Sequence, residues 1–284
     1  MKYALHFPNF GAFDPRTLAE LAKAGEDAGW DGIFVWDHVN RIWKVPVYDP
    51  WLCLAAVAMT TERVKIGAMI TPLARRRPQK VARETVTLDK LSNGRLIFGV
   101  GLGSTGGAEV EWSNFGEELN LKTRAAMTDE ALDILVGLWS GQPFSYPGEH
   151  YTVHESQFLP TPVQPFLTSD PLTVIRESQF PRSPLQYPRI PIWVAGHYPH
   201  KAPMRRAARW DGMFLHYRDV PDEAAAIKDS IEFVQQHRET SAPFDVVTLN
   251  ERPAEIDTSA KKRNSGYNRM IFPKTCRYYI FQLF

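Results

Sequence analysis

The chain has 284 residues, of which 44% are hydrophobic and 23% charged, as in ordinary soluble globular proteins. Its 33 basic and 32 acidic residues give a net charge of +1, which argues against a nucleic-acid partner or an anionic membrane surface. No apolar run approaches the roughly 18 residues of a membrane span. The N-terminus lacks signal-peptide features, and two cysteines are too few for a disulfide framework. We therefore expect a cytoplasmic protein.

The first half of the chain predicts four strand–helix units. Short apolar runs rich in β-branched residues indicate buried strands, and apolar residues at helical spacing follow each run. Asp14-Pro15 and Asp49-Pro50 each place an N-cap before a proline, which marks the start of a helix. Asn93-Gly94 supplies the left-handed residues that end another helix. The predicted strands are 3–7, 32–36, 64–70 and 96–100, and the predicted helices are 15–29, 50–61, 78–91 and 121–141.

The regular pattern stops after this half of the chain. Residues 143–203 hold 12 of the 22 prolines, too many for uninterrupted helices or central strands. We interpret residues 143–190 as a Pro-rich excursion, a feature that is often a lid or substrate loop. Within it, the segment ESQF at 155–158 recurs at 177–180, an offset of 22 residues that indicates a local duplication or insertion.

Regular elements return at residue 191. Strands are predicted at 191–195, 212–217 and 244–249, with helices around 204–208 and 221–239. After about residue 257 the tail is irregular. Residues 268–272 are a candidate eighth strand, and CRYYIFQLF at the end is too short and too apolar for a normal closing helix. Alternating strands and helices favour an α/β fold with a parallel sheet, whose chemistry sits at the carboxyl ends of the strands.

Several motifs now carry a resemblance. They are GWDGIFVWDHV, the block GAMITPLARRRPQKVARETVTLDKLSNGRLIFGVGLGS, EALDILVGLWSGQPFSYPGEHY, PRIPIWVAG and AARWDGMF. In this order they resemble the luciferase-like monooxygenase superfamily, which forms (β/α)8 TIM barrels and uses reduced FMN or the deazaflavin F420. The resemblance implies one barrel domain over residues 1–284, a homodimer and, for a monooxygenase, a separate flavin reductase. Two departures stand out: residues 165–187 look inserted, and the barrel looks incomplete at its C-terminal end.

The resemblance implies three catalytic residues. His38 matches the family's histidine near the flavin ring, and an imidazole there titrates near neutrality. Asp37 is expected to orient its neighbour or a backbone amide. Glu111 lies where relatives place a glutamate after strand four, with Glu109 as an alternative and a solvated carboxylate as the simpler interpretation. Arg75, Arg76 and Arg77 form a basic run that either faces the cofactor tail or an acidic substrate, or is solvated.

A second set of residues is expected to bind the cofactor. Asn9 could reach the ring from strand one, and Ala68-Met69 occupies the place of the family's bulge with a non-prolyl cis peptide. Gly196-His197-Tyr198, between a strand and a helix, suits the phosphate because free backbone N–H groups bind anions. The complete cofactor-binding set is Asn9, His38, Ala68, Met69, Gly101, Gly103, Ala195, Gly196, His197 and Tyr198.

Two other site types are not supported by the sequence. Residues 101–106 fit the GxGxxG dinucleotide fingerprint, but no apolar-periodic helix follows at once. His150/His154 and His197/His200 have ligand-like spacing without accompanying Cys or acidic residues, so no metal is predicted.

Three functions stay open at this stage. The leading hypothesis is a monooxygenase that uses reduced FMN and O2 on a small organic substrate, with the excursion shielding the reaction from water. The alternatives are F420-dependent hydride transfer, with His38 or Glu111 handling the proton, and a non-catalytic flavin-binding protein.

Overall fold

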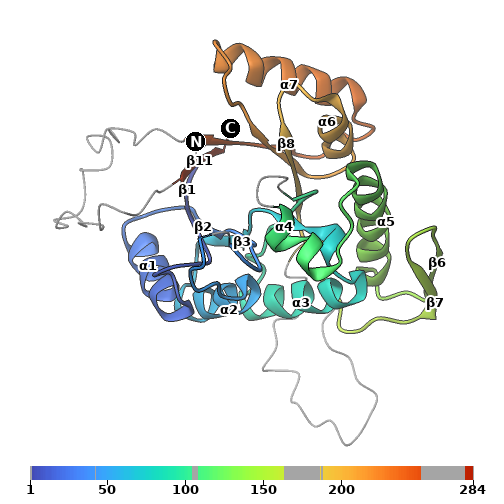
Figure 1. Ribbon diagram of the computed structural model, residues 1–284, viewed down its shortest axis with the longest axis horizontal. Coiled ribbons are helices and arrows are strands. Elements are labelled where there is room, and N and C mark those ends of the chain that lie inside the picture. The colour runs from blue at the N-terminus through green and yellow to red at the C-terminus, as the bar shows by residue number, and fades with distance from the viewer. Residues whose placement is uncertain are drawn as a thin grey trace, which may run out of the picture.

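A computed structural model describes residues 2–41, 43–103, 108–162, 186, 188–250 and 279–283; of 108–109, 249–250 and 279–283 it describes the backbone alone. Strands surround a central axis, and the larger helices lie outside them (Figure 1). The strands are β1 (Lys2–Phe7), β2 (Gly32–Val35), β3 (Lys65–Ala68), β4 (Thr71–Pro72), β5 (Phe98–Gly101), β6 (Phe144–Pro147), β7 (Thr152–Ser156), β8 (Ile192–His197), β9 (Gly212–His216), β10 (Asp245–Asn250) and β11 (Tyr279–Leu283). The helices are α1 (Pro15–Asp27), α2 (Pro50–Thr60), α3 (Pro78–Leu91), α4 (Ala108–Glu111), α5 (Leu121–Trp139), α6 (Lys201–Ala208) and α7 (Glu223–His237), with short 3-10 turns η1 (Leu73–Arg75) and η2 (Ser113–Phe115).

The main sheet follows the order expected of a TIM barrel. Its nine strands run β3-β2-β1-β11-β10-β9-β8-β5-β4, and every pairing is parallel except those of β11. Strands β3 and β4 are two parts of the third barrel strand. The Ile97 amide, directly before β5, donates to the Ile66 carbonyl of β3 at 2.8 Å, so β3 lies beside the start of β5. The predicted (β/α)8 fold is confirmed.

The eighth strand position is filled in a way that the sequence did not predict. Strand β11 lies inside the terminal CRYYIFQLF and runs antiparallel between β1 and β10. In register, Phe281 pairs with both Ala4 and Leu249. Its backbone therefore satisfies the edges of two strands that would otherwise be exposed. This pairing places the two termini side by side (Figure 1). The predicted strand at 268–272 lies outside the described residues.

The helix signals of the sequence act as predicted. The Asp14 carboxylate accepts hydrogen bonds from the amides of Arg16 and Thr17, and Asp49 caps α2 in the same manner. Asn93 and Gly94, after α3, have φ of 54° and 74°, the left-handed region that ends a helix. Among the described residues, no helix has the length and apolar character needed to cross a membrane.

Two apolar clusters form the core. The larger one packs the helices against the outside of the strands, as with Leu18, Leu54 and Leu135. The smaller one fills the inside of the barrel and consists of Ala4, Phe34, Met69, Ile97, Trp193, Phe214 and Val247. Side chains thus fill the barrel's centre, and chemistry is confined to its ends.

The Pro-rich excursion begins with the antiparallel hairpin β6–β7, which lies outside α5 (Figure 1). Glu130 of α5 anchors the hairpin turn, because its carboxylate accepts hydrogen bonds from the amides of Glu149, His150 and Tyr151. The segment expected to be inserted, 165–187, lies outside the described residues except for Gln186.

Candidate active site

The three residues expected to be catalytic meet at the carboxyl ends of the strands. Asp37 and His38 follow β2, and Glu111 ends α4, which follows β5. Nδ1 of His38 lies 2.6 Å from Oε1 of Glu111, although the residues are 73 positions apart in the chain. Both side chains are nearly buried, with 16% and 10% of their surface exposed. The side chain of Glu109, the alternative acid, is outside the described part.

The contact between His38 and Glu111 fixes the imidazole's tautomer. An ionised carboxylate can only accept hydrogen bonds, so Nδ1 of His38 carries the proton that it shares with Glu111. Nε2 then keeps a lone pair and is able to accept a proton or a hydrogen bond. This arrangement is the usual one for an imidazole that serves as a general base.

Glu111 is held in its ionised form. Burial alone would raise the pKa of Glu111, but its hydrogen bonds with His38 and Arg75 and the charge of Arg75 lower its pKa below the ordinary value. Arg75 Nη1 donates to Oε2 at 3.1 Å, and Arg41 Nη1 lies 3.3 Å from Oε1. The carboxylate therefore has a cationic or protonated partner on each oxygen.

Asp37 holds two arginines of the basic run, Arg75 and Arg76. Its carboxylate is fully buried and accepts hydrogen bonds from Arg75 at 3.0 Å and from Arg76 at 2.8 Å. The side chains of Arg75 and Arg76 are only 4% and 16% exposed, so the simpler interpretation of this run as solvated is wrong for both. They turn inward because the buried carboxylates of Asp37 and Glu111 need compensating charge.

Arg41 is a site residue that sequence reasoning missed. Its Nη1 lies 3.2 Å from Nδ1 and 3.3 Å from Nε2 of His38, and its guanidinium packs 4.4 Å from the centre of the Trp43 ring and 5.1 Å from that of Phe10. Cation–π contacts of this kind hold the group in place. A cationic residue three positions after His38, with a nearby tryptophan, was the only signal that the sequence offered.

Asn9 holds the loop that carries His38. Its Nδ2 donates to the carbonyls of His38 and Tyr48 at 2.8 and 2.7 Å, and its Oδ1 accepts from the His38 amide at 3.2 Å. All three bonds are made within the protein. They give the completely buried Asn9 a positioning role, and its expected contact with a cofactor ring stays a prediction.

Two further histidines line this end of the barrel, and neither was singled out from the sequence. His6 bonds to Trp36 through Nδ1 and to the Met69 carbonyl through Nε2. Burial lowers the pKa of His6 to about 3 and that of His216 to about 4, so both rings are neutral at neutral pH. Two buried, neutral rings therefore lie at the same end of the barrel as His38.

A non-prolyl cis peptide lies between β3 and β4, the two parts of the third barrel strand. It is one position later than expected. The cis bond joins Met69 to Ile70, so Ala68-Met69 is the residue pair directly before it. Met69 and Ile70 both pack with the inner apolar cluster, together with Ala195 of β8. Met69, Ile70 and Ala195 thus give an apolar surface at the end of the barrel where His38 lies.

Packing accounts for the two glycines at the end of β5, where Gly101 is the last residue of the strand and Gly103 lies two positions later. A Cβ at Gly101 would lie 2.8 Å from the Ile70 side chain. Gly103 has a φ of +79°, and a Cβ there would lie 2.5 Å from the Trp112 ring. Gly103 therefore requires glycine whether or not a cofactor approaches, while a side chain at Gly101 would need the end of Ile70 to shift. Cofactor binding by Gly101 and Gly103 stays a prediction.

The expected phosphate site differs from the sequence-based picture. Strand β8 continues through Gly196 and His197, which were expected in the loop, and His197 stacks on His216 with ring centres 5.0 Å apart. The Tyr198 amide donates to the His216 carbonyl at 3.1 Å, and burial lowers the pKa of His197. A phosphate bound here would meet the neutral imidazole of His197 and the Tyr198 amide, which already donates a hydrogen bond within the protein. Phosphate binding by this segment stays a prediction.

The residues at this end fit a flavin-like ring. Met69, Ile70 and Ala195 supply an apolar surface, and Nε2 of His38 supplies an acceptor. The buried hydroxyl of Thr71, directly after the cis bond, has no hydrogen-bond partner among the described residues. A buried polar atom of this kind normally bonds to a ligand or to water. These residues would hold an aromatic ring with polar edges.

Comparison with known proteins agrees with this picture. The chain is 33% identical over 164 residues to F420-dependent glucose-6-phosphate dehydrogenase of Gordonia bronchialis, covering 54% of this chain and 46% of that protein. The corresponding enzyme of Nakamurella multipartita is 31% identical over 159 residues, covering 54% and 45%. The chain thus spans about half the length of the curated relatives it matches.

Solved structures share the fold at lower sequence identity. An F420-dependent secondary alcohol dehydrogenase aligns with a TM-score of 0.63 and 21% identity, covering 84% of this chain and 64% of that one. The oxygenating constituent of 3,6-diketocamphane monooxygenase from Pseudomonas putida, in complex with FMN, aligns with 0.61 and 20%, covering 84% and 62%. The family model described as luciferase-like monooxygenase matches residues 4–272. The chain belongs to the luciferase-like monooxygenase family.

Proposed function

We propose that this chain is the barrel of an F420-dependent oxidoreductase, in which His38 moves the proton that accompanies hydride transfer between a small alcohol and its carbonyl product. The observation that carries the proposal is the 2.6 Å contact between His38 and Glu111, which leaves Nε2 as a base. The names of the two curated relatives support F420 over FMN. This ranking reverses the order that the sequence alone suggested.

Each side chain would have a separate task. When bound, F420 would supply the hydride acceptor, and the protein would handle the proton. Nε2 of His38 would take the proton of the substrate hydroxyl, and the Glu111 carboxylate would stabilise the imidazolium that results. Arg75 would hold Glu111 in place through its bond to Oε2, and Asp37 would hold Arg75. Arg41, next to Nε2, would bind the substrate oxygen or move aside.

The test follows F420 reduction by a panel of small alcohols under anaerobic conditions, in wild type and His38→Ala. We expect the rate constant to fall by about 10²–10⁴-fold while the Kd for F420 stays within a few-fold. His154→Ala, on the exposed strand β7, is the matched control and should leave both unchanged. An unchanged rate in His38→Ala would refute the role of His38.

An FMN-dependent monooxygenase is the second candidate. It is supported by the likeness to the FMN-bound structure and by the buried neutral His6 and His216, which place uncharged rings at the end of the barrel where His38 lies. Substrate-dependent O2 consumption with reduced FMN, and no reduction of F420 by alcohols, would favour it. Cofactor binding without any turnover would favour a non-catalytic flavin-binding protein.

A further inference from the structure

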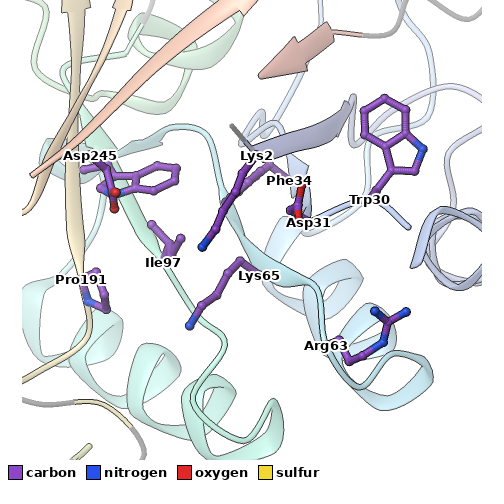
Figure 2. Close-up of a pocket in the computed structure, with 11 residues that line it drawn as sticks. Lys2, Trp30, Asp31, Phe34, Arg63, Lys65, Ile97, Pro191 and Asp245 are labelled. Carbon is purple, nitrogen blue, oxygen red and sulfur yellow. The ribbon is translucent and has the colours of Figure 1, made fainter. Parts of the chain in front are cut away.

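A cavity of about 720 Å³ opens at the opposite end of the barrel from His38 and Glu111 (Figure 2). Its lining residues lie in or next to the first halves of β1, β2, β3, β5, β8 and β10. The volume is in the range of small-molecule sites. The proposed reaction does not use this end.

The floor of the cavity is aromatic and apolar. Phe34 and Trp193 are each 1% exposed, and Ile97 is 5% exposed. All three belong to the cluster that fills the barrel, together with Met69 and Phe214. The filled barrel therefore separates a ligand in this cavity from the reactive end.

Two lysines enter the cavity from neighbouring parts of its rim. Lys2 begins β1 and Lys65 begins β3, and both strands pair with β2. Figure 2 shows both side chains extending toward the side where Ile97 and Pro191 lie, while Arg63 points away. Within the described ranges, the lysines that form ion pairs are Lys23, Lys80, Lys201 and Lys228. Lys2 and Lys65 are not among them.

Each carboxylate of the cavity has one oxygen bonded to a neutral donor of the fold, and the charge of Asp245 also acts on Lys2 and Lys65 without a direct ion pair among the described residues. Asp31 Oδ2 accepts from the Tyr3 amide at 2.8 Å, and Asp245 Oδ2 accepts from Trp193 Nε1 at 3.1 Å. Both acids therefore bond to neutral donors of the fold.

The Lys65 ammonium group is partly buried, and Lys2, an exposed residue, lies close enough for its charge to act on it. Burial lowers the pKa of Lys65, and the charge of Lys2 lowers it further, although Asp89 and Asp245 oppose this. Lys65 Nζ donates to the Gly94 carbonyl at 3.1 Å, which is a neutral partner and leaves its other two protons for a ligand. With no direct counter-ion for either lysine among the described residues, a bound anion would relieve their repulsion.

We propose that this cavity binds a small organic anion whose acidic head lies between Lys2 and Lys65 and whose apolar body packs on Phe34 and Trp193. A carboxylate, sulfonate or phosphate head satisfies the ammonium groups, and an aromatic or aliphatic body fills the rest of the volume. The ligand acts on the barrel from the end opposite the reaction and is not its substrate.

The probe is anilinonaphthalene sulfonate, an aromatic anion whose fluorescence rises on transfer from water. Phenylnaphthylamine, with the same rings and no charge, is the matched probe. We expect the Lys2→Gln/Lys65→Gln double variant to bind the sulfonate at least about tenfold more weakly and to bind the neutral probe like wild type. The control variant Lys122→Gln/Lys228→Gln loses the same charge from exposed helix positions and should bind the sulfonate like wild type.

Two further measurements keep the test decisive. Excess FMN and F420 should not displace the sulfonate, and its affinity for wild type should fall with added salt while that of the neutral probe does not. The salt series needs no variant, so it stands even if the double variant fails to fold. Displacement by either cofactor, or equal binding of the sulfonate to wild type and the folded double variant, would overturn the proposal.

Discussion

Replacing Asp37 by asparagine removes the buried charge on which two arginines depend. The Asp37 carboxylate is fully buried, and it accepts from Arg75 and Arg76 at 3.0 and 2.8 Å. Asparagine keeps the shape and one acceptor oxygen, but its NH2 group would face a guanidinium N–H. Arg76, which is 16% exposed, would then carry its charge without its acidic partner, and Arg75, which is 4% exposed, would keep only Glu111.

The expected loss of stability is large. Removing one partner of a buried ion pair costs about 3–5 kcal/mol. For a chain of this size, about 1 kcal/mol corresponds to roughly 2 °C in Tm, so Asp37→Asn should melt roughly 6–10 °C below wild type in a circular dichroism scan. Asp133→Asn removes the same charge from the exposed pair with Arg209, where the side chains are 39% and 50% exposed. That control should cost at most about 1 kcal/mol, or roughly 2 °C.

The comparison of the two variants tests the reasoning directly. If Asp37→Asn melts within about 2 °C of wild type, as expected of a surface pair, the arginines are hydrated and the Asp37 pair does not hold the site together. A large loss in both variants would point to a general charge effect instead.

Two further predictions concern stability. Because the folded pKa values of His6 and His216, about 3 and about 4, lie below the unfolded value of about 6.5, the unfolded chain binds more protons as the pH falls. Stability should therefore drop by roughly 3 kcal/mol between pH 7 and 5, and a urea midpoint that does not change over this range would contradict the neutral assignment. Glu26, which is 2% exposed, accepts three consecutive backbone amides, from Glu62 at 3.0 Å, Arg63 at 2.6 Å and Val64 at 3.0 Å, so Glu26→Gln should cost about 2–3 kcal/mol in the same assay. The exposed Glu232→Gln should be neutral within about 0.5 kcal/mol, and equal losses in the two glutamate variants would refute this account.

Much of the fold was predictable because its signals are local. Asp14-Pro15, Asp49-Pro50 and Asn93-Gly94 act through hydrogen bonds or backbone angles of adjacent residues, and each lies at the helix end where the sequence placed it. The parallel strands are short apolar runs, which the sequence also marks directly. Strand β11 was missed because its place depends on the open edges of β1 and β10 and not on its own pattern.

The site was predictable in part. Asp37, His38 and Glu111 were expected at the carboxyl ends of their strands, and the structure brings them together. Arg41 was not identified, and Arg75 was named without its carboxylate partners, because a basic residue in a loop has the same local pattern whether it is solvated or paired. Only the fold places Arg75 beside carboxylates 36 and 38 positions away.

The sequence by itself determined the class of fold, the order of the elements and the end of the barrel at which Asp37, His38 and Glu111 lie, since these follow from periodicity, capping and strand direction. The tertiary structure alone decided which charges meet. It pairs His38 with Glu111 and Asp37 with two arginines, and it leaves Lys2 and Lys65 facing an open cavity. The reason is physical: the free energy of a charge depends on its burial and on neighbours that are distant in sequence, and neither is encoded in the local pattern around it.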